Sequence, residues 1–204
     1  MSTGFNKDFE HNEALMKASL NEFITRGYEK ASINHILKMA NMSKGSFYYH
    51  FKNKEDLYFH LIQTLIEKKQ AFLSKAMTVE DYSTDIFSIF KTQIRLGMQF
   101  AVDYPDINRF ANSFVKEKGN DIYERALKKY NFENNDQINQ MIEASYHKGE
   151  FRENLPIEFI KRIIGFLFTH LGEITDISKP EHIEQEMNYF IDFLKMGLTK
   201  ERRE

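Results

Sequence analysis

The sequence contains no cysteine and only three prolines among its 204 residues. Without cysteine the chain has no disulfide framework, no thiolate metal site and no cysteine nucleophile, and a reducing cytoplasm is its expected location. The prolines, at positions 105, 156 and 180, leave long stretches of chain in which a helix would not be interrupted.

Long apolar runs are also missing. The first residues carry no apolar segment of the kind found in a signal peptide. The longest apolar run, residues 163–171, is interrupted by Gly165, Thr169 and His170. It falls well short of the roughly 20 residues needed to span a bilayer. We therefore expect a cytoplasmic protein with no membrane partner.

Charge is close to balanced overall but unevenly distributed. The net charge is −2, which excludes a chain that is basic throughout. Residues 26–54 contain six Lys or Arg against one acid, a net of +5, whereas residues 133–204 contain nine basic against fourteen acidic residues, a net of −5. A basic N-terminal segment followed by an acidic remainder indicates two parts with different partners.

Apolar residues recur with helical spacing along nearly the whole chain, and the alternation typical of strands is absent. The pattern predicts an all-α protein of about nine helices. We expect an N-terminal three-helix module over residues 1–54 and a larger helical domain over residues 55–204. The expected helices cover residues 12–25, 33–40, 44–51, 54–76, 83–103, 105–116, 121–148 with a break near 132–135, 156–177 and 180–198.

The segment from residue 32 to 54 carries the clearest functional signal. Ser32, Ser43 and Asn53 are suited to cap three successive helices, and Asp56 is placed to complete a capping box with Asn53. The short middle helix has poor intrinsic helix propensity. With its two phenylalanines facing a core, its other side is small, hydroxylated and weakly basic. Such a face suits the major groove of DNA, and the free N–H groups at the helix starts suit phosphates.

These residues resemble the DNA-binding module of the TetR/AcrR family of bacterial transcriptional regulators. The resemblance covers about residues 11–60, and the matching positions are Gly27, Tyr28, Ser32, Ile33, Ile36, Ala40, 42–51, 53–55 and Leu57. Asn41 stands where the family usually has glycine, and asparagine tolerates the left-handed conformation required there. The resemblance implies a helix-turn-helix, a homodimer on a palindromic operator in double-stranded DNA, and a C-terminal domain whose small-molecule inducer releases the DNA.

The same resemblance assigns roles to individual side chains. The expected phosphate ligands are Ser32, Ser43, Tyr48, His50 and Lys54, and the residues expected to face bases are Lys44, Gly45, Ser46 and Tyr49. Two alternatives remain open at this point. Tyr48 could complete the core of the module, and His50 could pack as a cap on the first helix.

The last two predicted helices carry apolar residues on more than one side, which favours burial against both the chain itself and a partner. The expected dimer interface comprises Ile163, Leu167, Met187, Phe190, Ile191 and Leu194. Two such helices from each protomer would form a four-helix interface. The alternative is an ordinary monomeric core.

The segments between the fourth and the eighth predicted helix, residues 77–155, are rich in aromatic residues and methionine, which line pockets for apolar ligands and also fill ordinary cores. The candidate ligand-binding residues are Arg95, Met98, Gln99, Tyr104, Phe110, Phe114, Met141, Phe166 and His170. Among them, His170 lies in an apolar run and is either a ligand anchor or a satisfied core histidine.

Three functions compete at the level of sequence. The first is a repressor released from its operator by a small, largely apolar ligand. The second is a nucleoid- or division-associated protein of the same fold that binds DNA with little sequence preference. The third, an enzyme, is disfavoured because the sequence has no metal-ligand spacing, no nucleophile–base signature and no glycine-rich phosphate loop. No cofactor and no metal are expected.

Overall fold

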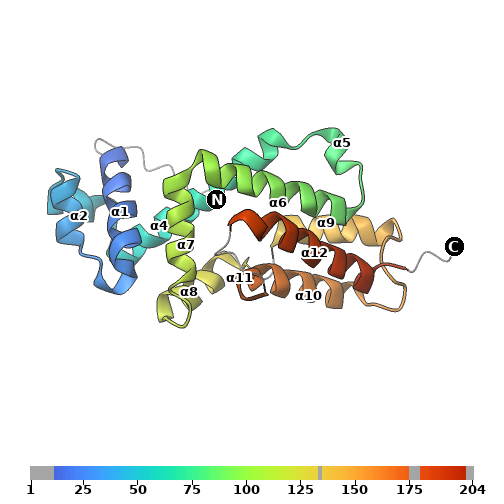
Figure 1. Cartoon of the computed structure of the whole chain (residues 1–204). Coiled ribbons are helices and arrows are strands. Elements are labelled where there is room, and N and C mark those ends of the chain that lie inside the picture. The colour runs from blue at the N-terminus through green and yellow to red at the C-terminus, as the bar shows by residue number, and fades with distance from the viewer. Residues whose placement is uncertain (1–11, 133–134, 175–179, 201–204) are drawn as a thin grey trace. The chain divides into compact units, whose positions relative to one another are not determined.

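The computed structural model describes residues 12–132, 135–174 and 180–200. Twelve helices are assigned in these ranges, and the strand-like pairing found there is one isolated antiparallel bridge between Phe151 and Thr199. The all-α prediction is therefore confirmed (Figure 1). The helices are α1 Asn12–Lys30, α2 Ile33–Met39, α3 Lys44–His50, α4 Lys54–Ala76, α5 Val79–Tyr82, α6 Ile86–Asp103, α7 Pro105–Val115, α8 Asp121–Tyr130, α9 Asp136–His147, α10 Ile157–Thr169, α11 Leu171–Ile174 and α12 Pro180–Leu198.

The expected number of helices, about nine, was too low for three local reasons. A single turn, α5, forms before α6 because Thr78 and Asp81 make a reciprocal capping box around it. The long helix predicted over residues 121–148 is split into α8 and α9, at the break that the sequence indicated. The helix predicted over residues 156–177 ends at His170, which leaves the short α11 as a separate element.

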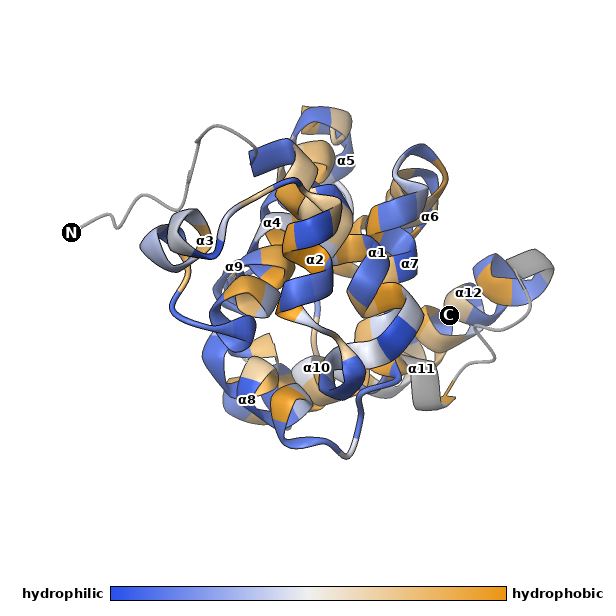
Figure 2. Ribbon diagram, turned by 90° about the vertical axis from the view of Figure 1, so that its left-hand side faces the viewer, coloured by the Kyte–Doolittle hydropathy of each residue, from blue (hydrophilic) through white to orange (hydrophobic). Residues whose placement is uncertain are grey.

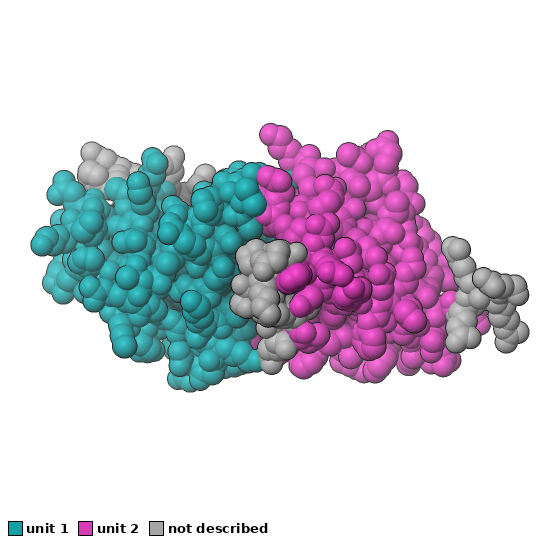
Figure 3. Space-filling model, in the orientation of Figure 1, with its two compact units in different colours: residues 1–72, 100–126 teal, residues 73–99, 127–204 magenta. Residues whose placement is uncertain are grey.

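The chain divides into two compact units (Figure 3). The first contains the described residues of 1–72 and 100–126, and the second contains those of 73–99 and 127–204. The boundary between them falls within α4, α6 and α8. The division predicted at residue 54 separates DNA binding from ligand binding, and it stays a prediction about function. No helix in the described ranges is long and apolar enough to cross a bilayer.

The first unit is built around a cluster of four aromatic rings from three helices. The ring of Tyr58 lies 4.8 Å from that of Phe23, 4.9 Å from Tyr28 and 5.5 Å from Phe110, measured between centroids. All four side chains are buried. Burial, together with the negative charge of Glu117, raises the pKa of the Tyr58 phenol. This cluster joins α1, α4 and α7 in one core.

A buried carboxylate fastens the end of α7 to the end of α1. Glu117 Oε1 accepts a hydrogen bond of 2.6 Å from the backbone N–H of Tyr28, and Oε2 accepts one of 2.7 Å from Asn120 Nδ2. Gly27 has φ of 70° and ψ of 172°, so α1 is kinked there, two residues after the end predicted for the first helix. This turn presents the Tyr28 N–H to Glu117, which offsets the cost of burying the carboxylate.

The second unit has an aliphatic and aromatic core contributed by α6, α9, α10 and α12. Most helices carry hydrophobic and hydrophilic residues side by side (Figure 2), as expected for helices that cover a core on one face. Polar contacts tie the end of α12 to other segments of this unit. Lys195 Nζ lies 3.1 Å from Asp85 Oδ2, and Arg152 Nε donates to the Thr199 carbonyl over 3.0 Å.

The contact between Gly27 and Glu117 predicts a measurable difference between two glycines. A Cβ added at Gly27 would lie 2.9 Å from Glu117 Oε1, whereas a Cβ at Gly119, which also has positive φ, would meet nothing within 4 Å. We expect Gly119→Ala to cost about 1–2 kcal/mol through backbone strain alone. Gly27→Ala should lower the free energy of unfolding by about 1–3 kcal/mol more, because the Glu117 hydrogen bond is also lost. Urea denaturation of both variants measures this, and equal losses would contradict it.

Candidate nucleic-acid interface

Side-chain caps fix the starts of α2, α3 and α4. Ser32 Oγ accepts from His35 N at 3.4 Å, and Ser43 Oγ accepts from Ser46 N at 3.1 Å. At the start of α4, Asn53 Oδ1 accepts from the backbone N–H of Asp56 at 2.9 Å. The Asp56 carboxylate in turn accepts from Lys52 N at 3.0 Å, one residue before the position of a regular capping box.

The turn between α2 and α3 takes the shape expected from the sequence. Asn41 has φ of 50°, in the left-handed region that asparagine tolerates. The N–H of Met42, whose side chain is buried, bonds to the Leu37 carbonyl at 2.9 Å. The turn thus directs α3 away from the end of α2.

α3 has one buried and one exposed face. Phe47 and Phe51 are fully buried, with ring centroids 5.5 Å apart. Tyr49 is 85% exposed and Tyr48 is 58% exposed. The alternative in which Tyr48 completes the core is therefore wrong. His50 is half-buried, with its ring 5.0 Å from that of Tyr49, so it lies at the edge of the exposed face.

The first turn of α3 is open to an approaching molecule. Lys44 and Gly45 are exposed, and Ser46 is half-buried. A Cβ added at Gly45 would meet only Ser43 Oγ, at 3.9 Å, so the chain itself does not require glycine at this position. The space beside the Gly45 backbone is therefore open to an approaching molecule.

Lys54 has a role that the sequence did not indicate. Its ammonium donates to the carbonyl oxygens of Tyr28, Glu29 and Ala31 at 2.7, 3.0 and 3.4 Å, and it lies 4.5 Å from the centre of the Tyr28 ring. An ammonium has three N–H donors, so these carbonyls can occupy all of them. Lys54 stabilises the C-terminal end of α1 in this structure, and its contact with phosphate stays a prediction.

A second buried carboxylate, Glu22, was also missed. Its side chain accepts from Ser32 N at 2.9 Å and lies 2.6 Å from His35 Nδ1. Burial by itself raises the pKa of Glu22, but the hydrogen bonds from Ser32 and His35 and the charge of Arg26 outweigh it, and the pKa is lowered. The sequence did contain a signal for this buried carboxylate. Glu22 follows Leu15 by seven residues and precedes Phe23, so helical spacing places it on the same buried face of the first helix.

The predicted ligand-binding residues are distributed between the two units. In the first unit, Phe110 is fully buried in the aromatic core, Phe114 stacks on Tyr123 at 4.8 Å, and Tyr104 is partly exposed beside Phe100. In the second unit, Arg95 and Gln99 are exposed and Met98 and Met141 are half-buried. The remaining two members, Phe166 and His170, stack with ring centroids 4.1 Å apart at the C-terminal end of α10, where His170 follows the last helical residue.

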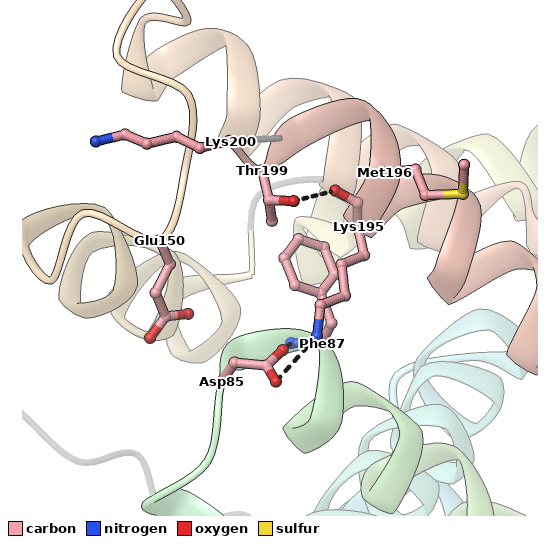
Figure 4. Close-up of a pocket in the computed structure, with 7 residues that line it drawn as sticks. All are labelled: Asp85, Phe87, Glu150, Lys195, Met196, Thr199 and Lys200. Atoms are coloured by element: carbon pink, nitrogen blue, oxygen red, sulfur yellow. Dashed lines mark hydrogen bonds and ion pairs between the residues drawn. The ribbon is translucent and has the colours of Figure 1, made fainter. Parts of the chain in front are cut away.

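A hollow of about 590 Å³ lies elsewhere in the second unit (Figure 4). Its lining, within the described part of the chain, consists of Asp85, Phe87, Glu150, Lys195, Met196, Thr199 and Lys200. These are not the predicted ligand residues. The charged side chains that line the hollow already have partners within the protein. Lys195 pairs with Asp85, and Lys200 pairs with Glu153. Glu150 accepts a hydrogen bond from the backbone N–H of Ile86.

The predicted dimer residues lie inside the second unit itself. Met187, Phe190, Ile191 and Leu194 on α12 are buried in the protomer, and Ile163 and Leu167 on α10 pack half-buried against the same core. These four α12 side chains are already covered within the protomer, and their part in a dimer interface stays a prediction. The opposite face of α12 exposes Tyr189, Phe193 and Met196.

No group of three or more His, Asp or Glu side chains in the described ranges could hold a metal ion. The groups suited to bind DNA lie on the module formed by α1 to α3 and the start of α4. That module has capped helix starts, a hydroxylated and aromatic α3 face, and net positive charge.

Comparison with known proteins gives one consistent answer. A family model described as bacterial regulatory proteins of the tetR family matches residues 15–61. The uncharacterized HTH-type transcriptional regulator YdgC of Bacillus subtilis is 26% identical over 189 residues, which cover 89% of this chain and 90% of YdgC. The negative regulator of the icaADBC biofilm operon, IcaR of Staphylococcus epidermidis, is 23% identical over 127 residues, 58% of this chain and 68% of IcaR.

The structural comparison agrees with the sequence comparison. A TetR family transcriptional regulator from Chloroflexus aurantiacus superposes with a TM-score of 0.64 and 25% identity, covering 96% of both chains. These relatives are named as transcriptional regulators. The family match lies on the helix-turn-helix, so residues 15–61 match the DNA-binding domain of the tetR family, and the chain is similar along nearly all of its length to HTH-type transcriptional regulators.

Proposed function

We propose that this regulator is a repressor that binds a palindromic operator as a homodimer and is released by a small, largely apolar ligand. The observation that carries the proposal is the exposed face of α3, where Lys44, Gly45 and Tyr49 face solvent while Phe47 is buried behind them. Repression is supported by the similarity to IcaR, which is named as a negative regulator.

In the proposed complex α3 enters the major groove and α2 crosses the DNA backbone, as in other helix-turn-helix proteins. Lys44, Ser46 and Tyr49 would contact base edges. Ser32, Ser43, Tyr48 and His50 would contact phosphates, because they lie at the starts of α2 and α3 or along the exposed side of α3. Lys54 is the weakest member of the predicted set, because its ammonium is held by three carbonyls.

The dimer surface that we propose consists of two apolar stripes. On α12, Tyr189, Phe193 and Met196 have the spacing i, i+4, i+7, and Phe193 is 70% exposed. On α10, Phe159 and Phe166 are exposed at the same spacing, with the half-buried Ile163 between them. Both helices contribute their opposite faces to the core of the second unit. Pairing these stripes with a second copy would form the four-helix interface expected for the family.

A ligand site is supported by aromatic side chains that are not fully covered. In the first unit the ring of Phe72 lies 5.4 Å from Phe100 and 6.3 Å from Tyr104, and the Tyr104 ring is partly exposed. Exposed aromatic faces beside buried ones suit a flat or apolar molecule. We therefore retain Tyr104 from the predicted ligand set as the residue to test first.

The DNA-binding proposal predicts a sequence-selective complex. A duplex selected from a random pool by the wild-type protein should bind with an affinity that falls steeply as salt rises, since phosphate contacts release counterions. Lys44→Ala should cost about 1–3 kcal/mol of binding and relax the preference at one base pair. Lys75→Ala, at the far end of α4, is the matched control. Equal affinity for random DNA would favour the nucleoid-type function, and binding that is insensitive to salt would contradict both.

The dimer proposal predicts that a charge on the α12 stripe yields monomers. Phe193→Asp should shift the protein from dimer to monomer and weaken binding to the selected duplex, because burying a charge in an apolar interface is unfavourable. Val79→Asp changes an equally exposed apolar residue of the same unit outside the stripe. Sedimentation velocity measures both variants. A Phe193→Asp protein that remains dimeric would show that the interface lies elsewhere.

The ligand proposal predicts a shared response in stability and in DNA binding. In a panel of hydrophobic and aromatic compounds, at least one should raise the melting temperature and release the selected duplex. Tyr104→Ala should reduce that response, whereas Tyr82→Ala, which removes a similarly exposed tyrosine on α5, should leave it unchanged. A panel that produces neither effect at saturating concentration would count against an apolar inducer.

A further inference from the structure

The strongest unexplained feature is the carboxylate of Glu22, which lies in the core of the DNA-binding module. Glu22 is 2% exposed. It bonds to the backbone N–H of Ser32 at 2.9 Å and to His35 Nδ1 at 2.6 Å, and Arg26 Nε lies 3.3 Å away. A buried carboxylate is costly, so a pure packing role would be served better by an apolar residue at this position.

The imidazole of His35 connects this buried charge to the surface. Its side chain is 42% exposed while Nδ1 is engaged by Glu22. The other ring nitrogen, Nε2, lies on the opposite edge of the ring and therefore points away from Glu22. His35 is in the first turn of α2, the helix that crosses the DNA backbone in a helix-turn-helix. The exposed Lys38 follows one turn later on the same side.

We infer that His35 is an additional DNA-phosphate ligand, positioned by Glu22, and that it binds phosphate in its protonated form. The inference rests on the proposed DNA-binding function. It adds a residue that the sequence did not suggest and makes operator binding dependent on pH.

The chemistry of imidazole requires this coupling. In the neutral ring, an Nδ1–H that donates to Glu22 leaves a lone pair on Nε2, which repels a phosphate oxygen. Protonation by solvent places a second N–H on Nε2, so the ring donates to Glu22 and to the phosphate at the same time. Charged groups near the ring are Glu22 and Arg26 on α1 and Lys38 on α2. Each phosphate contact of this kind takes up at most one proton and releases counterions from the DNA.

The test measures affinity of the full-length protein for the selected duplex and for a mixed-sequence duplex, as a function of pH and of salt. The wild type should bind more tightly as pH falls, by at most about tenfold per pH unit for one proton. His35→Gln should flatten this dependence and reduce the slope of log affinity against log salt by about 0.9. His35→Lys, which is charged throughout, should restore the salt slope without the pH dependence.

Further variants separate positioning from folding. Glu22→Gln keeps the shape of the side chain but removes its charge, so it should weaken the pH dependence while its circular dichroism shows an intact helical fold. His147→Gln changes an exposed histidine on α9 and should behave as wild type. His50→Gln tests the other histidine of the module.

The outcomes distinguish this inference from the function on which it rests. If the pH dependence persists in His35→Gln or disappears only in His50→Gln, His35 is not the proton-linked ligand, and the DNA-binding proposal stands. If Glu22→Gln and His35→Gln lower stability but leave both slopes unchanged, the pair is purely structural. If the wild type binds neither duplex, the proposed function itself is wrong and this inference falls with it.

Discussion

Burial of Phe47 and Phe51 is the constraint on which the DNA-binding module depends. α3 has seven residues, too few for an isolated helix to persist in water, and its glycine, serine and aromatic residues are weak helix formers. The two phenylalanines stabilise the helix by tertiary packing. Their rings pack against each other, and the Phe51 ring also packs against His60 of α4. The same packing determines that Tyr48, Tyr49 and Lys44 face outward. Recognition chemistry and helix stability therefore come from opposite sides of one short element.

Two buried carboxylates organise the remainder of the first unit. Glu22 joins α1 to the start of α2, and Glu117 joins α7 to the end of α1. Each is compensated by a backbone N–H at a point where the chain leaves a helix or enters one, so the desolvation cost is offset only in one arrangement of the helices. Lys54 joins α4 to the end of α1 by a complementary contact, because its ammonium donates to backbone carbonyls there. Polar groups with few possible partners thus define how α1, α2, α4 and α7 meet.

α12 shows how one helix can serve two surfaces. Ile191 and Leu194 face the core of the second unit, while Phe193 and Met196 face solvent. The residues that look most like a dimer interface by periodicity are those that the protomer uses for itself. The apolar residues that remain exposed on α12 form the stripe that we propose as a dimer surface. A hydrophobic stripe in the sequence identifies a buried face but not the molecule that buries it.

The sequence by itself determined the longer helices, the caps Ser32, Ser43 and Asn53, the break in the first helix near Gly27, the left-handed turn at Asn41 and the two-faced character of α3. These features depend on residues within about four positions of each other, so local spacing and backbone preference are sufficient. Only the tertiary structure decided that Lys54 is held by carbonyls, that Glu22 meets His35, and which face of α12 is internal. Those outcomes depend on groups that folding brings together from distant parts of the chain. Such contacts produce no regular spacing in the sequence, so periodicity cannot predict them.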